Sequence, residues 1–138
     1  MLVYRYDNQD YQDGEVIFSR GDHADGLTEI EREVEARLRA ASAEGEPIRR
    51  DSLYTWQDED FARLAGSFKR ARFLYELEVN DADIRHVGDL DHYSAAKDAA
   101  KLGQPYARHL EAYWTQRTGA RRVEILAASA RVVRKLSF

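Results

Sequence analysis

Along several short stretches of this chain every second side chain is apolar, which is the pattern of a β-strand with one buried face. Residues 72–79 are the clearest example, because Phe73, Tyr75 and Leu77 alternate with positions that include two glutamates. Comparable runs predict strands at 2–6, at 15–18, at 52–56 and, as a closing pair, within 122–136.

Other stretches repeat their apolar residues every three or four positions, as an amphipathic helix does. The first such helix is predicted to begin at Thr28, which forms a capping box with Glu31, and to end at Gly45 and Pro47. Further helices are predicted after Asp58, over 94–102 and from Pro105. Residues 80–92 follow neither pattern and are predicted to form a loop.

With the brief strand at 15–18 left aside and the helix from Pro105 taken as a continuation of 94–102, these elements follow one another as β, α, β, α, β, α, β, β, which predicts an α+β fold with a mixed β-sheet and flanking helices. The chain has 138 residues. This is a usual length for one domain, and folding at this size buries about two-thirds of the surface. Because the sequence shows no internal repeat or linker, we predict a single domain over residues 1–138.

Composition and charge narrow the classes of function. Hydrophobic residues make up 43% of the chain and charged residues 33%, as in a soluble globular protein. The formal net charge of −4 gives no broad basic field for nucleic acids or anionic membranes. The chain has no cysteine, which excludes disulfides and thiolate metal ligands. Since no signal peptide or membrane span is visible, we expect a protein of the cytoplasm, or one delivered into a target cytoplasm.

A carboxylate lies inside the first strand of the closing pair. Because side chains alternate along a strand, Val123 and Ile125 point to one face and Glu124 to the other. If the two apolar residues face a core, Glu124 is fixed on a rigid element. It is then either a solvated polar residue or a positioned catalytic group.

Two further stretches carry candidate binding residues. Arg5 is flanked by tyrosines on the opening strand, Tyr6 among them. Its guanidinium could donate two hydrogen bonds to a phosphate, or its stem could simply pack on a sheet edge. Ser52, Tyr54 and Trp56 share one face of another strand. There they could bind and stack a flat heteroaromatic ring, or belong to the core.

Taken in order, these segments resemble the three signatures of the ADP-ribosyltransferase superfamily, in particular its small bacterial, toxin-like members. Tyr4-Arg5 resembles the signature on the first strand, and Glu124 in Val-Glu-Ile-Leu resembles the catalytic glutamate near the end. The middle signature fits two subclasses, one marked by a serine, here Ser52, and one by a tyrosine, here Tyr54. The resemblance implies a split β-sheet and covers the whole chain.

The resemblance also implies that NAD is the substrate and that its nicotinamide–ribose bond is cleaved. This reaction passes through an oxocarbenium-like transition state, which a carboxylate stabilises. Glu124 would supply that carboxylate, Ser52 would hold the ribose or its neighbours, and Arg5 would bind the pyrophosphate. Tyr54 and Trp56 would stack on nicotinamide. The residues expected to meet in this one cleft are Arg5, Tyr6, Ser52, Tyr54, Trp56 and Glu124.

The resemblance further implies that the acceptor of ADP-ribose is a protein or a nucleic acid, or water in an NAD glycohydrolase. Arginine-modifying members carry a second glutamate two positions before the catalytic one, where this chain has Arg122. We therefore do not expect a protein arginine as acceptor, and Arg121 with Arg122 favours an acidic or nucleic-acid acceptor. A toxin-like member also implies an antitoxin or immunity protein as partner.

The sequence also leaves other functions open. The chain could be a non-catalytic nucleotide-binding or protein-interaction module that retains the fold. No metal ion is expected, because the histidines and aspartates of 86–92 match no strong ligand spacing. The acidic run Glu29–Glu35 is predicted to be a solvated helix face.

Overall fold

The computed structural model describes residues 1–116 and 122–138. Its strands are β1 (Leu2–Asp7), β2 (Val16–Phe18), β3 (Leu53–Trp56), β4 (Phe73–Glu78), β5 (Ile84–Asp89), β6 (Val123–Ala127) and β7 (Ser129–Leu136). Its helices are α1 (Glu29–Ala40), α2 (Gly45–Asp51), α3 (Glu59–Phe68), α4 (Leu90–Lys101) and α5 (Ala107–Thr115), with 3-10 turns η1 (His23–Gly26) and η2 (Asp81–Asp83). Within the described residues, none of these helices has the length and apolar character to span a bilayer.

The strands form one sheet in the order β2-β7-β4-β1-β3-β6-β5, and every pairing between described strands is antiparallel. The α+β class is therefore confirmed, whereas the prediction of a mixed sheet is wrong. The reason lies in the strand order. Helix α3 connects β3 to β4, but β1 lies between these strands and pairs antiparallel with both. A helical connection implies parallel neighbours only when the strands it joins are adjacent.

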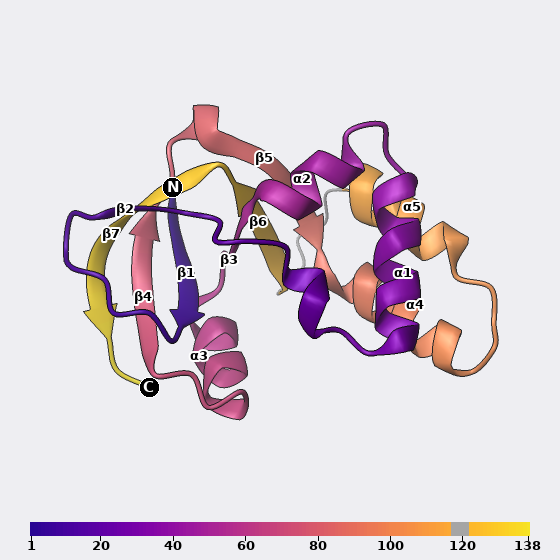
Figure 1. Cartoon of the computed structure of the whole chain (residues 1–138), viewed down its shortest axis with the longest axis horizontal. Helices are drawn as coiled ribbons and strands as arrows, with labels where there is room; N and C mark the ends of the chain where they lie inside the picture. The colour runs from indigo at the N-terminus through magenta and orange to yellow at the C-terminus, as the bar shows by residue number, and fades with distance from the viewer. Residues whose placement is uncertain (117–121) are drawn as a thin grey trace.

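The prediction of a split sheet is wrong for the described strands, because all seven form one continuous sheet, although this sheet has one narrow junction. Strands β1 and β3 share a single register pair, Tyr4 opposite Trp56. By contrast, β1 pairs with β4 along its whole length, from Leu2 to Asp7. Figure 1 shows β2, β7, β4 and β1 on one side of this junction and β3, β6 and β5 on the other.

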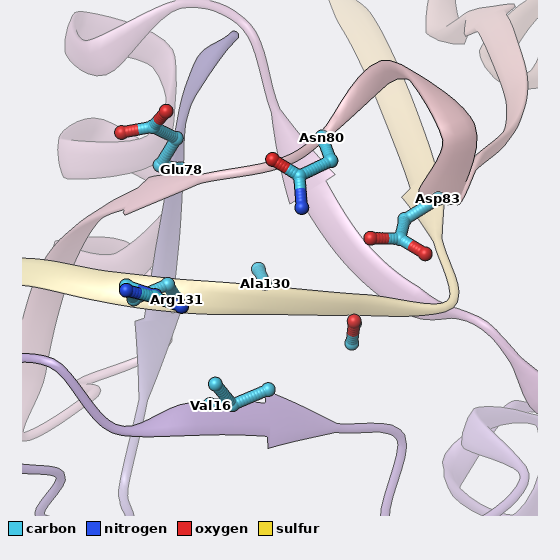
Figure 2. Close-up of a pocket in the computed structure, with 7 residues that line it drawn as sticks. Val16, Glu78, Asn80, Asp83, Ala130 and Arg131 are labelled. Carbon is cyan, nitrogen blue, oxygen red and sulfur yellow. The ribbon is translucent and has the colours of Figure 1, made fainter.

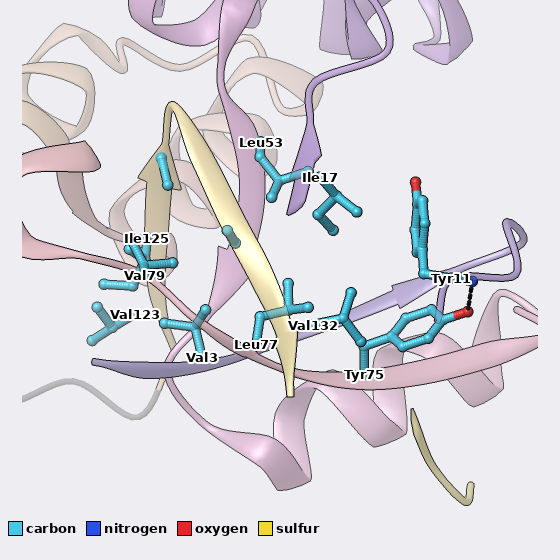
Figure 3. Close-up of a cluster of buried hydrophobic side chains, with 12 residues drawn as sticks. Val3, Tyr11, Ile17, Leu53, Tyr75, Leu77, Val79, Val123, Ile125 and Val132 are labelled. Atoms are coloured by element: carbon cyan, nitrogen blue, oxygen red, sulfur yellow. Dashed lines mark hydrogen bonds between the residues drawn. The ribbon is translucent and has the colours of Figure 1, made fainter. Parts of the chain in front are cut away.

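Both faces of the sheet are covered by apolar side chains. On the first face, Val3, Tyr75 and Ile125 belong to one buried cluster (Figure 3). Tyr11 joins this cluster by donating its backbone N–H to the Tyr75 hydroxyl at 2.9 Å. On the second face, Trp56 belongs to a cluster that also includes side chains of α1, α3, α4 and α5. Alternate residues of each strand thus serve two separate cores.

The start of α1 is as the sequence predicts, but its end is not. The backbone N–H of Glu31 donates to the Thr28 hydroxyl at 3.3 Å, and the Glu31 carboxylate accepts from the Thr28 backbone, which confirms the capping box. Gly45 and Pro47, predicted to end this helix, lie instead in the first turn of α2. A proline is tolerated in a first turn because the N–H it lacks has no partner there.

The predicted loop at 80–92 is wrong. It contains η2, strand β5 and the first residues of α4. Strand β5 lies at the edge of the sheet, where Arg85 is exposed and His86 only half-buried. An edge strand can carry polar side chains on a face that a central strand would bury, so its alternating pattern is hidden.

Candidate functional site

Glu124 is the second residue of β6 and is buried, with only 4% of its surface exposed. Its carboxylate oxygen Oε1 accepts a hydrogen bond from the Tyr113 hydroxyl at 2.6 Å and another from Nη1 of Arg49 at 3.0 Å. Val123 and Ile125 point into the first-face cluster, so Glu124 projects from the second face, as alternation predicts. The carboxylate is therefore held inside the protein rather than in an open cleft.

Arg49, from α2, is the centre of this buried network. Its Nε and Nη2 each donate to one carboxylate oxygen of Glu35, both at 2.7 Å, and its Nη1 also donates to the Tyr113 hydroxyl at 2.7 Å. The guanidinium lies 5.1 Å from the ring centres of Tyr54 and Tyr93. Burial alone would lower the pKa of Arg49, but the surrounding oxygens outweigh burial and raise this pKa well above its usual value.

A pocket of about 300 Å³ lies where β1 and β3 diverge. Its wall is made by residues of β1, of the segment before and into η1, and of the start of β3: Arg5, Ser19, Arg20, Gly21, Asp22, His23, Ser52, Leu53 and Tyr54. Arg5 crosses the junction, because its Nη1 donates to the backbone oxygen of Tyr54 at 2.7 Å. Two arginines, two serine hydroxyls and an aromatic ring thus surround one space.

Two side chains connect this pocket to the buried network. His23 lines the pocket, and its Nε2 lies 2.7 Å from Oε1 of Glu35. Tyr54 also lines the pocket, and its ring lies 4.3 Å from the ring of His23 and against the guanidinium of Arg49. Glu124 is therefore one layer behind the pocket wall.

The pocket brings together three of the residues predicted from the sequence, namely Arg5, Ser52 and Tyr54. Ser52 is almost fully buried, and its hydroxyl accepts a long hydrogen bond from Arg85 at 3.4 Å. Tyr6 and Trp56 do not line it. Their rings stack on each other at 4.8 Å with an interplanar angle of 7°, so both are engaged in packing on the second face.

The prediction that Arg5 and Glu124 share one cleft is wrong. Tyr4, Trp56 and Glu124 lie in register across three strands and hence on one face of the sheet. Arg5 follows Tyr4 and pairs with Tyr75, a member of the first-face cluster. Arg5 and Glu124 therefore project from opposite faces.

The residues named for acceptor choice are also placed differently from expectation. Arg122, which precedes β6, donates to Asp91 at 3.2 Å and to the Ser94 hydroxyl at 3.0 Å, so its side chain lies against helix α4 and does not line the pocket. Arg121 lies outside the described residues.

Sequence reasoning missed Glu35, Arg49, Arg20 and His23. Glu35 lies in the run predicted to be a solvated helix face, yet it is 1% exposed, which corrects that prediction. A signal was present, because Glu35 directly follows the apolar stripe residue Val34. Arg49 directly follows the apolar Ile48, but it also precedes Arg50 and Asp51, and nothing in these three charged residues distinguishes the buried one.

A second pocket, of about 260 Å³, lies beside β2 and β7 (Figure 2). Glu78, Asn80 and Asp83 contribute to its wall, together with Arg131. It contains none of the residues predicted from the sequence.

Within the described ranges, no three histidine, aspartate or glutamate side chains are grouped so that they could hold a metal ion. A comparison of the chain with protein-family models and with curated proteins finds no match.

Proposed function

We propose that the protein binds NAD in the pocket at the β1–β3 junction and cleaves its nicotinamide–ribose bond, as a mono-ADP-ribosyltransferase or an NAD glycohydrolase. The observation that carries the proposal is the meeting of Arg5, Ser52 and Tyr54 in one pocket. These residues come from segments almost fifty positions apart, and each was singled out for a role toward NAD. The sheet is continuous, but the pairing of β1 with β3 through one register pair is its weakest junction, and the pocket lies beside it.

The chemistry of the wall suits a dinucleotide. Arg5 supplies a charged planar donor for phosphate oxygens, and the ring of Tyr54 supplies a flat apolar surface for a base or nicotinamide. At about 300 Å³ the pocket is at the lower end of the usual range for ligand sites. It therefore suits part of NAD, with the remainder extending from the opening.

Glu124 is the proposed catalytic carboxylate, but it is buried and projects from the sheet face opposite Arg5, so its role requires a rearrangement. Arg49 neutralises it, and Tyr54 separates it from the pocket. The proposal therefore includes a movement of Tyr54 and Arg49 on NAD binding that exposes Glu124 to the ribose. Its acceptor would be a protein or nucleic acid, or water if the protein is a glycohydrolase.

A second candidate function is favoured by the position of Glu124. Glu124 is buried and paired with the buried Arg49, and a carboxylate with only a structural role has the same surroundings. In that case the pocket binds a nucleotide without cleaving it, and the protein is a binding or interaction module.

The test combines NAD binding with release of free nicotinamide, measured on the wild type and on Glu124→Gln. We expect the wild type to bind NAD and release nicotinamide, with a rate about a hundredfold to a thousandfold lower in Glu124→Gln, as when one preorganised electrostatic contact is lost. NAD affinity should change little, because the charge acts mainly on the transition state. Glu111→Gln, an exposed position on α5, is the matched control.

Three outcomes separate the candidates, provided that each variant is shown to be folded by circular dichroism. Binding without nicotinamide release, in the presence of candidate acceptors, would favour the binding module. Full release by Glu124→Gln would remove Glu124 from the reaction. A wild type that neither binds nor cleaves NAD would refute the proposed function.

A further inference from the structure

Two guanidinium groups at the pocket share one carboxylate. Nε of Arg5 lies 3.0 Å from Oδ2 of Asp7, and Nη2 of Arg20 lies 2.7 Å from Oδ1 of the same residue. The Asp7 side chain is 4% exposed, and its Oδ1 also accepts the backbone N–H of Gln9 at 3.0 Å. Burial would raise the pKa of Asp7, but the neighbouring arginines and the bond from Gln9 outweigh it and lower this pKa. Asp7 is thus an ionised, fixed anchor for both arginines.

Because Arg5 and Arg20 share the single carboxylate of Asp7, this part of the pocket wall carries an excess of positive charge. Two guanidinium groups against one carboxylate carry a net charge of one positive unit, and Arg20 is half-exposed toward solvent. The other charged groups of the wall have their own partners. Asp22 is held by both terminal nitrogens of Arg39, and His23 lies against Glu35. The unbalanced charge of the pocket therefore lies at Arg5 and Arg20.

Anchoring by Asp7 prepares these donors for a ligand. Arg5 is also bonded to the Tyr54 backbone, and Nη1 of Arg20 to the Gln9 side chain at 3.2 Å. Arginine side chains that are already ordered lose less entropy on binding than free ones. Guanidinium groups bind phosphate oxygens with paired, charge-assisted hydrogen bonds, and two adjacent groups match two linked phosphates.

We propose that Arg20, held beside Arg5 by Asp7, is a second ligand-binding arginine and that the pair binds the diphosphate of a nucleotide. The sequence offered no signature for Arg20, and its role depends on a contact with a residue thirteen positions away. The inference rests on the proposed function only for the identity of the nucleotide, because it requires no bond cleavage. The ligands that share this subsite are then NAD, ADP-ribose, ADP and inorganic pyrophosphate.

The experiment is a calorimetric titration of the wild type with ADP-ribose, ADP, inorganic pyrophosphate and adenosine. The three diphosphates should bind, and adenosine should bind at least about tenfold more weakly than ADP, since it lacks the charged groups. Arg20→Ala should weaken the binding of ADP-ribose about tenfold to a hundredfold, the loss expected for hydrogen bonds to a charged group. Arg20→Lys should restore only part of the affinity, because its single ammonium lacks the planar fork.

Arg63→Ala is the matched control, because Arg63 is a surface arginine of α3 whose charge partners are on the same helix. The affinity of Arg63→Ala for ADP-ribose should equal that of the wild type.

The inference would be overturned if adenosine bound as tightly as ADP, or if Arg20→Ala bound ADP-ribose as tightly as the wild type. If the wild type binds the diphosphates through Arg20 but never releases nicotinamide from NAD, the inference stands and the proposed cleavage fails. If nicotinamide is released equally well by Arg20→Ala at NAD concentrations below saturation, the cleavage stands and the inference fails.

Discussion

Arg49 and Arg50 are neighbours with opposite surroundings. The side chain of Arg49 is 1% exposed and touches two carboxylates, whereas that of Arg50 is 49% exposed and pairs with Asp51 at the surface. A buried charge has lost its hydration and depends on its partners, whereas an exposed pair contributes little to stability. Substitutions at these two positions of α2 therefore compare a buried arginine with an exposed one in the same helix.

We expect Arg49→Met to destabilise the protein by about 3–5 kcal/mol, because it leaves Glu35 and Glu124 buried without their shared cation. Arg50→Met should change the free energy of unfolding by less than about 0.5 kcal/mol. Urea denaturation of both variants, followed by circular dichroism, measures the difference. Similar midpoints for the two would mean that the network does not stabilise the fold.

Helix α5 packs closely on strand β5 beside this network because position 88 of the strand is a glycine. Gly88 of β5 lies opposite Glu124 of β6, and a Cβ atom at position 88 would collide with the ring of Tyr113 from α5. The glycine thus lets α5 approach the sheet closely enough for the Tyr113 hydroxyl to reach Glu124. This close approach sets the geometry of the network.

Gly88→Ala should therefore cost about 1–3 kcal/mol of stability, the usual cost of overpacking a core. The control is Gly26→Ala, because a Cβ at position 26 would meet no atom within 4 Å. It should differ little from the wild type. Thermal melting of the two variants provides the comparison, and equal melting temperatures would show that Tyr113 can move aside without cost.

For the molecule as a whole, the buried carboxylates make stability depend on pH. Burial would raise the pKa of Glu35, but its bond to His23 and the charge of Arg49 outweigh burial and lower this pKa from 4.5 to about 2. Because the folded pKa lies below the unfolded one, the unfolded chain binds more protons between these values. The stabilisation is complete above about pH 4.5 and is lost as pH falls toward 2. Asp7 and Asp22, whose pKa values are also lowered, act in the same direction.

Glu35→Gln should remove the part of this pH dependence that comes from Glu35, while the parts from Asp7 and Asp22 remain. Between pH 7 and pH 3 the stability gap between the wild type and Glu35→Gln should narrow, by an amount on the order of 3 kcal/mol when followed to still lower pH. Glu33→Gln, at an exposed position of the same helix, should show a constant gap. Denaturation curves at several pH values measure both. A gap that does not narrow for Glu35→Gln would contradict the role of Glu35 as a buried, ionised carboxylate.

The sequence by itself determined the features that depend on neighbours along the chain. The alternation of 72–79 gave strand β4, the Thr28–Glu31 pair gave the start of α1, and the mixture of elements gave the α+β class. It also singled out Arg5, Ser52 and Tyr54, which the structure places around one pocket.

Only the tertiary structure decided what depends on contacts between distant residues. The directions of the strands follow from the position of β1 between β3 and β4, and nothing local to these strands encodes it. Arg49 meets Glu124 across 75 positions, and Arg5 meets the backbone of Tyr54 across 49. Whether a charge is buried depends on which partners the fold brings to it, because the cost of desolvation is offset only by those partners. The sequence could therefore point to Glu124 as a candidate residue on a strand, but it could not show that this side chain is buried behind the pocket.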